Sequence, residues 1–424
     1  MTGMKYAGVV AGCIIAVAAV GCAKQQLMPT PNMYAKSSVD PFAKVTPPLQ
    51  TSDIDVLFVT DRAETQDKNG KSDFGYGRSR SLAFGSYIVG VGENLSWTDL
   101  VADSRTQSRK HSLPLSRKEI RVLGRLDETP TPMVMINGVP QEDPAAKEQR
   151  EQMRTVFCNE ISRRLAQSPS KKEVAVFIHG FNNTIDDAAF TIGEVWHFTG
   201  REGVPIAYTW PAGKSYGYDY ESCQFTIFHL KQFLRAIASC PGVEKIHIIA
   251  HSRGTDVATT ALRELNIEYK SAGKDTRAEL KLGNVVLCAA DLDIDVVSQR
   301  IGAERLYFVP ERTTLYVSQT DKALGAADWL LKSQDRLGHV NSSELTPQQR
   351  KMLAMLPQIQ IVEANVKSDM IGHAYFHNNP AVSSDLILVV RDNRDPGAEN
   401  GRPMIRREDG FWEIRDDYLL SASK

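Results

Sequence analysis

Apolar and polar positions follow two different periods along most of the chain, and together they predict its secondary structure. Short apolar runs typical of buried strands alternate with longer stretches in which apolar residues recur every three to four positions, as in amphipathic helices. The runs predict strands at 54–60, 82–91, 174–178, 205–210, 245–250, 284–289, 312–317 and 359–366. The longer stretches predict helices at 145–167, 186–198, 220–239, 255–265, 294–301 and 324–331.

Strands that alternate with helices predict an α/β fold with a mostly parallel central sheet and helices on both of its faces. Reactive side chains are then expected at the carboxyl ends of the strands. Residues 93–144 mix short apolar runs with many charges and support no chemical assignment, while 411–414 predict a last packed strand.

The first 50 residues lack this alternation and read instead as a targeting segment. An apolar run at 9–20 follows one positive charge and ends in Ala19-Val20-Gly21-Cys22, which is the layout of a secretory signal peptide and resembles the lipobox of bacterial lipoproteins. We expect 1–21 to be a lipoprotein signal peptide and Cys22 to carry the lipid, with an uncleaved N-terminal anchor as the alternative. The polar, proline-bearing residues 22–50 predict a flexible tether.

Export sets the expected location and partners. By resemblance to lipoprotein sorting signals, Ala23 favours the outer membrane, so we expect a protein of the cell envelope that faces the periplasm. The membrane is then a partner through the lipid anchor. The formal net charge of the 424 residues is -1, which gives no strong field to attract nucleic acid, and we expect no such partner.

Cysteine and histidine positions predict neither a disulfide framework nor a metal site. Cys223 and Cys240 lie near opposite ends of one predicted helix, about 25 Å apart, and Cys288 lies within a strand. The histidine pairs 247/251 and 373/377 have no clustered cysteine or carboxylate to complete a metal site. We therefore expect no disulfide framework, no metal and no cofactor.

The stretch 245–265 has the features of a nucleophile elbow. A predicted buried strand leads into Ala250-His251-Ser252-Arg253-Gly254, and a predicted helix follows. Small residues two positions before and after Ser252 let strand and helix approach closely, while the serine hydroxyl is pushed out on a strained turn. The usual motif begins with glycine where this chain has Ala250, and an N-capping serine in an ordinary turn is the alternative.

Serine needs a base and an orienting acid, and both are found after later strands. Asp321 follows the strand 312–317 and His373 follows 359–366, in the chain order expected of α/β-hydrolases. Asp321 can instead cap a helix, His373 can be structural, and Asp291 is a rival acid. The backbone N–H groups of Phe181 and Arg253 are the candidate oxyanion donors. His179 is a less favoured base, and more plausibly a structural hydrogen-bonding residue.

The chain resembles the α/β-hydrolase family of uncharacterised function labelled DUF900. The resemblance spans about 54–390 and rests on V-T-D-R (59–62), F-I-H-G-F-N-N-T (177–184), A-Y-T-W-P (207–211), A-H-S-R-G (250–254), V-V-L-C-A-A-D-L-D (285–293), L-Y-V-S-Q-T-D-K-A-L (315–324) and G-H-A-Y-F (372–376). It implies the hydrolase fold and a triad of Ser252, Asp321 and His373, but no substrate. Arg253 departs from the methionine expected there. It either favours anionic substrates or, as we favour, pairs with Asp256.

These features predict a serine hydrolase, an esterase or lipase acting on a small-molecule or lipid ester through an acyl-enzyme. The alternatives are a non-catalytic envelope lipoprotein that binds a partner, and a peptidase or acyltransferase on the same triad. We expect a hydrolase domain at 51–424, with N-terminal strands and a lead-in helix (51–170), a catalytic core (171–390) and a tail (391–424). Tyrosines in 213–221 either line an acyl pocket or belong to a solvated loop.

Overall fold

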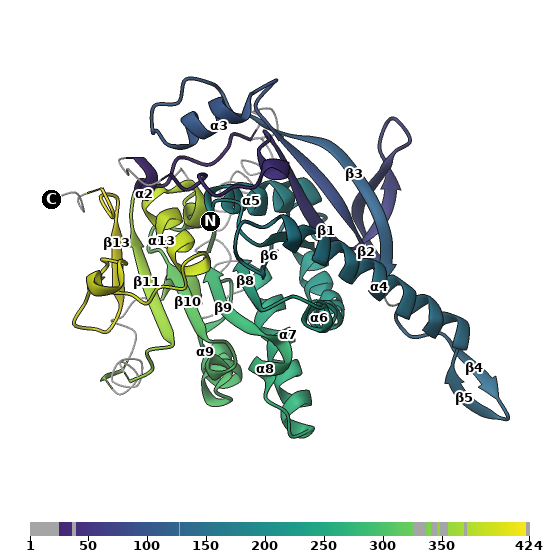
Figure 1. Cartoon of the computed structure of the whole chain (residues 1–424). Coiled ribbons are helices and arrows are strands. Elements are labelled where there is room, and N and C mark those ends of the chain that lie inside the picture. Colours follow the sequence, from purple (N-terminus) through teal and green to yellow (C-terminus); the bar gives the residue numbers. More distant parts are fainter. Residues whose placement is uncertain are drawn as a thin grey trace, which may run out of the picture.

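One eleven-stranded sheet organises the computed structural model, which describes residues 25–35, 40–126, 128–324, 336–340, 346–347, 355–368 and 371–420 (Figure 1). The strands lie in the order β12-β13-β11-β10-β9-β8-β6-β7-β1-β2-β3. Their bounds are β1 Asp53–Gln66, β2 Ser72–Val91, β3 Leu115–Leu126, β6 Glu173–Ile178, β7 Val204–Thr209, β8 Lys245–His251, β9 Leu282–Cys288, β10 Arg312–Val317, β11 Ile359–Asn365, β12 Ile405–Arg406 and β13 Trp412–Arg415.

Every neighbouring pair from β1 across to β13 is parallel, and β2, β3 and β12 pair antiparallel at the two edges. The α-helices are α2 Asn32–Ala35, α3 Trp97–Ser104, α4 Pro144–Gln167, α5 Ile185–Phe198, α6 Tyr216–Ser239, α7 Gly254–Ser271, α8 Thr276–Leu280, α9 Ile294–Val297, α12 Tyr375–Asn378 and α13 Pro380–Val390. The predicted α/β class, with its mostly parallel sheet, is confirmed.

Helices cover both faces of the sheet because successive strand residues point to opposite sides. In β6, Val176 and Ile178 belong to a core cluster shared with α4, α6 and α7, while Phe177 belongs to a second cluster shared with α5 and α13. The apolar stripe predicted for α7 faces the first cluster: Val257, Ala258, Ala261, Leu262 and Leu265 are all buried there.

The order of the strands reverses next to β6. The chain passes from β6 to β7 on one side and then returns to place β8 on the other side of β6. In open parallel sheets a crevice forms outside the carboxyl ends of the strands at such a switch point. The turns after β6 and β8 therefore meet at the position where a ligand is expected.

The segment predicted to be a flexible tether is packed, so that prediction is wrong for its described part. Leu27 and Met28 are buried, the Leu27 N–H donates to the Leu113 carbonyl (2.8 Å), and the Met28 N–H donates to Glu194 (2.8 Å). Buried Tyr34 donates to the Phe198 carbonyl, so the segment lies on the face of the sheet covered by α5 (Figure 1). The packing could not be predicted because the apolar residues of this segment are isolated among polar residues and prolines.

A disulfide joins Cys158 of α4 to Cys240, the residue after α6, with Cα atoms 5.0 Å apart. The expectation of no disulfide was wrong because it considered Cys240 only with Cys223, within one helix. The partner comes from a different helix, 82 residues earlier in the chain, which the fold packs alongside. Cys223 and Cys288 are free and buried.

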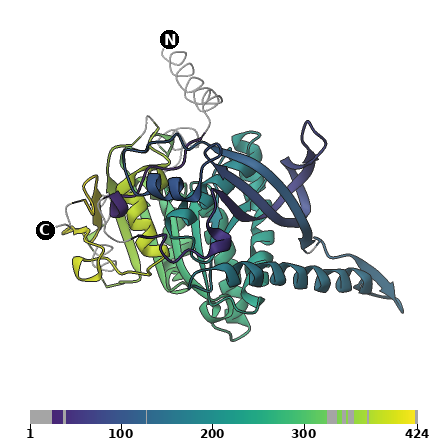
Figure 2. The same ribbon diagram turned by 45° about the horizontal axis from the view of Figure 1, so that its top comes forward.

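Residues 93–144 form α3, β3 and the hairpin of β4 (Met133–Ile136) and β5 (Val139–Glu142). The hairpin stands at the outer end of α4, away from the main sheet (Figure 2). Strands β1 and β2 extend beyond the predicted ranges, over 61–66 and 72–81, because polar residues and glycines replace the apolar run there and most of these positions are at least partly exposed. The predicted strand at 411–414 is confirmed as β13.

Two predictions fall outside the described residues. They are the signal peptide 1–21 with the lipidation site Cys22, and most of the helix at 324–331. Within the described ranges, no helix combines the length and apolar character needed to cross a bilayer.

Candidate active site

Ser252 stands in the turn between β8 and α7, in the shape that the sequence predicted. Its φ of +52° is left-handed, a conformation that costs a non-glycine residue on the order of 1 kcal/mol and that the surroundings must hold. The Ser252 N–H donates to the Cys288 carbonyl, and its own carbonyl accepts from the Thr255 N–H, both at 3.0 Å. Gly254 is required, because a Cβ there would lie 2.4 Å from the His179 carbonyl oxygen.

Asp321 and His373 meet at the same edge of the sheet. The buried Asp321 carboxylate accepts from His373 Nδ1–H through Oδ2 (2.7 Å). Its other oxygen, Oδ1, accepts from the N–H groups of Ala323 (3.1 Å) and Leu324 (3.3 Å). Asp321 thus caps the helix with one carboxylate oxygen and contacts His373 with the other. The cap fixes the carboxylate that faces His373.

His373 also contacts the residue next to the serine. His251 Nε2–H donates to the His373 carbonyl (3.0 Å), and the two rings lie 4.6 Å apart. Among the described residues, no hydrogen bond joins the Ser252 hydroxyl to His373. In ligand-free enzymes this contact is often long and shortens only with substrate bound.

Gly180 brings the turn after β6 against the serine. A Cβ on Gly180 would lie 2.6 Å from Ser252 Cβ and 3.2 Å from its Oγ, so only glycine fits. Within the described part of the chain, neither the Phe181 N–H nor the Arg253 N–H donates a hydrogen bond outside the helices and strands. Both groups are therefore available to a substrate oxygen, as the predicted oxyanion hole requires.

Asp219 holds the loop after β6, and the sequence did not reveal it. Its buried carboxylate accepts from the N–H groups of Asn182 (3.1 Å), Gly213 (2.8 Å) and Lys214 (3.3 Å). Burial raises the pKa of Asp219, and these three N–H donors partly offset that rise. The sequence feature that could have revealed Asp219 is its place in the first turn of α6, a helix that begins at the carboxyl edge of the sheet.

His179 is a structural residue rather than a base. Its Nδ1–H donates to the Gly180 carbonyl (2.9 Å), its Nε2 accepts from the Trp210 N–H (3.1 Å), and its ring stacks on Trp210. Burial, aided by the nearby Arg62 guanidinium, lowers the pKa of His179 to about 3. Arg62, from the V-T-D-R motif, also donates to the Asn183 carbonyl (2.6 Å) and so supports the same loop.

The Arg253 guanidinium forms the expected pair with Asp256, but its closer partner is Asp291. Its Nη2 lies 2.6 Å from Asp291, whereas Nη1 lies 3.6 Å from Asp256. Burial alone would lower the pKa of Arg253, but Asp291, Tyr216 and Asp256 together outweigh it and the pKa is raised. Asp291 also pairs with Arg336 (3.4 Å). Asp291, the alternative candidate for the triad acid, therefore contacts two arginines, whereas His373 contacts Asp321.

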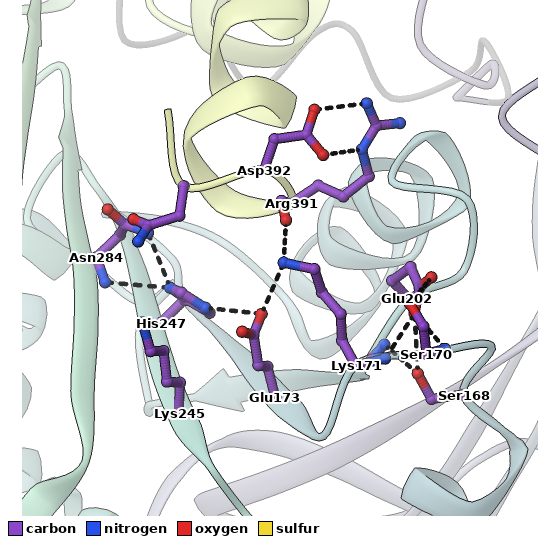
Figure 3. A network of polar contacts seen from close by, with 12 residues as sticks. Ser168, Ser170, Lys171, Glu173, Glu202, Lys245, His247, Asn284, Arg391 and Asp392 are labelled. Atoms are coloured by element: carbon purple, nitrogen blue, oxygen red, sulfur yellow. Dashed lines mark hydrogen bonds and ion pairs between the residues drawn. The ribbon is translucent and has the colours of Figure 1, made fainter. Parts of the chain in front are cut away.

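The histidine pairs considered for metal binding are separated by the fold. His247 lies at the opposite, amino-terminal edge of the sheet, between Glu173 (3.3 Å) and Asn284 (3.1 Å), as Figure 3 shows. His377 pairs with Glu194 (2.7 Å) instead of turning toward His373. In the described ranges, no three histidine, cysteine or carboxylate residues are grouped so that they could hold a metal ion.

Comparison with known proteins supports the same scaffold. The profile of the family described as an alpha/beta hydrolase of unknown function (DUF900) matches residues 153–391, from the middle of α4 to the end of α13. This range includes the turns after β6 and β8 and the Asp321–His373 contact. No curated protein matches the chain. With the sheet, the serine turn and this match in agreement, the chain belongs to the DUF900 family of alpha/beta hydrolases.

Proposed function

We propose that the protein is a serine hydrolase of the esterase or lipase type. The observation that carries the proposal is the 2.7 Å contact between Asp321 and His373, beside a serine held in a left-handed turn. Ser252 Oγ attacks the ester carbonyl carbon as His373 Nε2 takes the hydroxyl proton, and Asp321 holds the opposite ring N–H.

The N–H groups of Phe181 and Arg253 receive the negative charge that develops on the carbonyl oxygen. His373 then returns the proton to the departing alcohol, which leaves an acyl group on Ser252. Water, deprotonated by the same histidine, attacks the acyl carbon and releases the acid. No metal or cofactor takes part in this scheme.

A fluorescent fluorophosphonate probe tests the proposal. We expect covalent labelling of the purified protein and loss of labelling in Ser252→Ala, while Ser271→Ala, at the far end of α7, is labelled as the wild type. Equal labelling of Ser252→Ala refutes the assignment. A panel of esters, amides and acyl acceptors distinguishes an esterase from a peptidase or acyltransferase. Failure of both probe and panel favours a non-catalytic binding protein.

We further propose that the protein is lipid-anchored through Cys22 in the cell envelope, in the outer membrane facing the periplasm. The Cys158–Cys240 disulfide supports export, because disulfides persist in oxidising compartments. Metabolic labelling with an alkyne fatty acid tests this. We expect Cys22→Ala to lose the label and to leave the membrane fraction. Cys13→Ala, which changes the other cysteine of the N-terminal segment, keeps the label and the membrane location. A label retained by Cys22→Ala refutes the anchor.

A further inference from the structure

Aromatic side chains line one side of the serine turn. Phe181, directly after Gly180, is 37% exposed, and its ring centre lies 5.4 Å from that of Tyr216. Tyr220, one turn further along α6, is 48% exposed. We call Phe181, Tyr216 and Tyr220 the aromatic rim. Gly180 packs so closely on Ser252 that a Cβ would collide with it, and Phe181 is the next residue in the chain.

The cation beside the rim is fully engaged. The Arg253 side chain is only 6% exposed, and its guanidinium lies 5.8 Å from the ring centres of both Tyr216 and Tyr220. It donates to the Tyr216 hydroxyl (2.7 Å) as well as to Asp291.

The surrounding charges are balanced. Asp256 and Asp291 oppose Arg253 and Arg336, so two carboxylates face two guanidinium groups. A substrate anion that recruited Arg253 would leave the buried Asp291 with a weakened pairing, which is costly. The Arg253 side chain therefore fixes its own backbone and the two tyrosine rings in place. It does not serve as a binding group for an anionic substrate.

Two more cations lie near the rim but face another ring. Lys214 Nζ and the Arg78 guanidinium lie over Tyr218, at 4.5 and 4.8 Å from its centre. The Tyr218 hydroxyl in turn donates to the Tyr76 carbonyl (2.7 Å). This second group of aromatic and basic residues is tied to β2, away from the Phe181–Tyr216 pair.

We propose that the aromatic rim selects esters whose acyl group is uncharged and carries an aromatic ring, which stacks on Phe181 and Tyr216. The inference rests on the proposed serine-hydrolase function and names its substrate class. Faces and edges of the rings offer stacking geometry to a substrate ring, whereas a carboxylate would lose hydration beside an Arg253 that is already paired with Asp291.

Three 4-methylumbelliferyl esters with the same leaving group test the proposal: 3-phenylpropanoate, hexanoate and hemiglutarate. We expect kcat/KM to be highest for the phenylpropanoate, and lower by about tenfold or more for the anionic hemiglutarate. In Phe181→Leu, which keeps the backbone N–H, kcat/KM for the phenylpropanoate falls by about three- to tenfold, and the hexanoate value changes less. Phe228→Leu, which changes another exposed phenylalanine (47%) on α6, is the control and leaves the preference intact.

The outcomes separate the two proposals. Cleavage that depends on Ser252 but is fastest with the hemiglutarate overturns the inference and leaves the hydrolase function standing. An unchanged phenylpropanoate-to-hexanoate ratio in Phe181→Leu also overturns it, because the ring then selects nothing. No Ser252-dependent cleavage of any ester overturns the hydrolase function and this inference with it.

Discussion

Acidification is expected to destabilise the protein through His179, and the structure gives the size of the effect. The folded protein holds the pKa of His179 at about 3, against an ordinary value of 6.5 in the unfolded chain. The folded pKa is the lower one, so the neutral imidazole contributes stability that is present above pH 6.5 and lost as the pH falls toward 3. Each pH unit within this window costs about 1.4 kcal/mol.

Between pH 8 and pH 5, this single group removes about 2 kcal/mol from the free energy of unfolding. His197 and His251 act in the same direction, because burial lowers their pKa values well below the ordinary one. Urea unfolding at several pH values, followed by tryptophan fluorescence, measures the total. Trp210, which stacks on His179, is among the reporters.

The variant His179→Gln isolates the contribution of His179. We expect it to be less stable than the wild type at pH 8, because glutamine replaces the ring contacts of a buried side chain imperfectly. Its loss of stability between pH 8 and pH 5 should nevertheless be smaller than that of the wild type by about 2 kcal/mol. An identical pH dependence in the two proteins would refute the reasoning. It would mean that the pKa of His179 is the same in the folded and the unfolded protein.

Three further predictions concern the loop, the turn and the disulfide. Asp219→Ala removes the acceptor that holds the loop carrying the proposed oxyanion donor Phe181, and we expect kcat to fall by about 100-fold with little change in KM. Gly180→Ala should abolish probe labelling in a folded protein, because its Cβ would collide with Ser252. Replacing Cys158 and Cys240 together by alanine should lower the free energy of unfolding by about 4 kcal/mol, from the 82-residue separation.

Each of these predictions has its own control. For Asp219→Ala the control is Asp275→Ala, which removes a helix cap on α8 and should leave kcat unchanged. For Gly180→Ala it is Gly217→Ala, where an added Cβ meets nothing within 4 Å. Dithiothreitol should reproduce the cysteine effect in the wild type. A fully active Asp219 variant, a labelled Gly180 variant, or stability independent of reduction would contradict the respective prediction.

Much of the secondary structure could be predicted from the local periodicity of apolar residues. The strand Arg312–Val317 has the predicted bounds, and the predicted ends of α4 and α5 agree with the structure to one residue. Such elements are readable because buried strands are uniformly apolar and helices alternate every three to four positions. The extensions of β1 and β2 were unreadable because their exposed halves carry mixed polar residues on both faces.

The candidate site could be assembled from the sequence because each of its residues follows a predicted strand. Parallel strands bring their carboxyl ends to one edge, so Ser252, Asp321 and His373 could be expected there together. Asp219 could not be found in this way, because its role depends on backbone N–H groups from two other loops. The same holds for Arg62, because its partners Ala212 and Asn183 lie more than a hundred residues away.

The sequence by itself determined the α/β alternation, the strained serine turn and the order of the acid and the histidine, because each depends on neighbouring residues. The tertiary structure alone decided which distant side chains meet. It paired Cys158 with Cys240, packed Leu27 and Met28 of the predicted tether against the domain, and placed Asp291 closer to Arg253 than Asp256. Contacts across such separations depend on how the helices dock on the sheet, which no local pattern encodes.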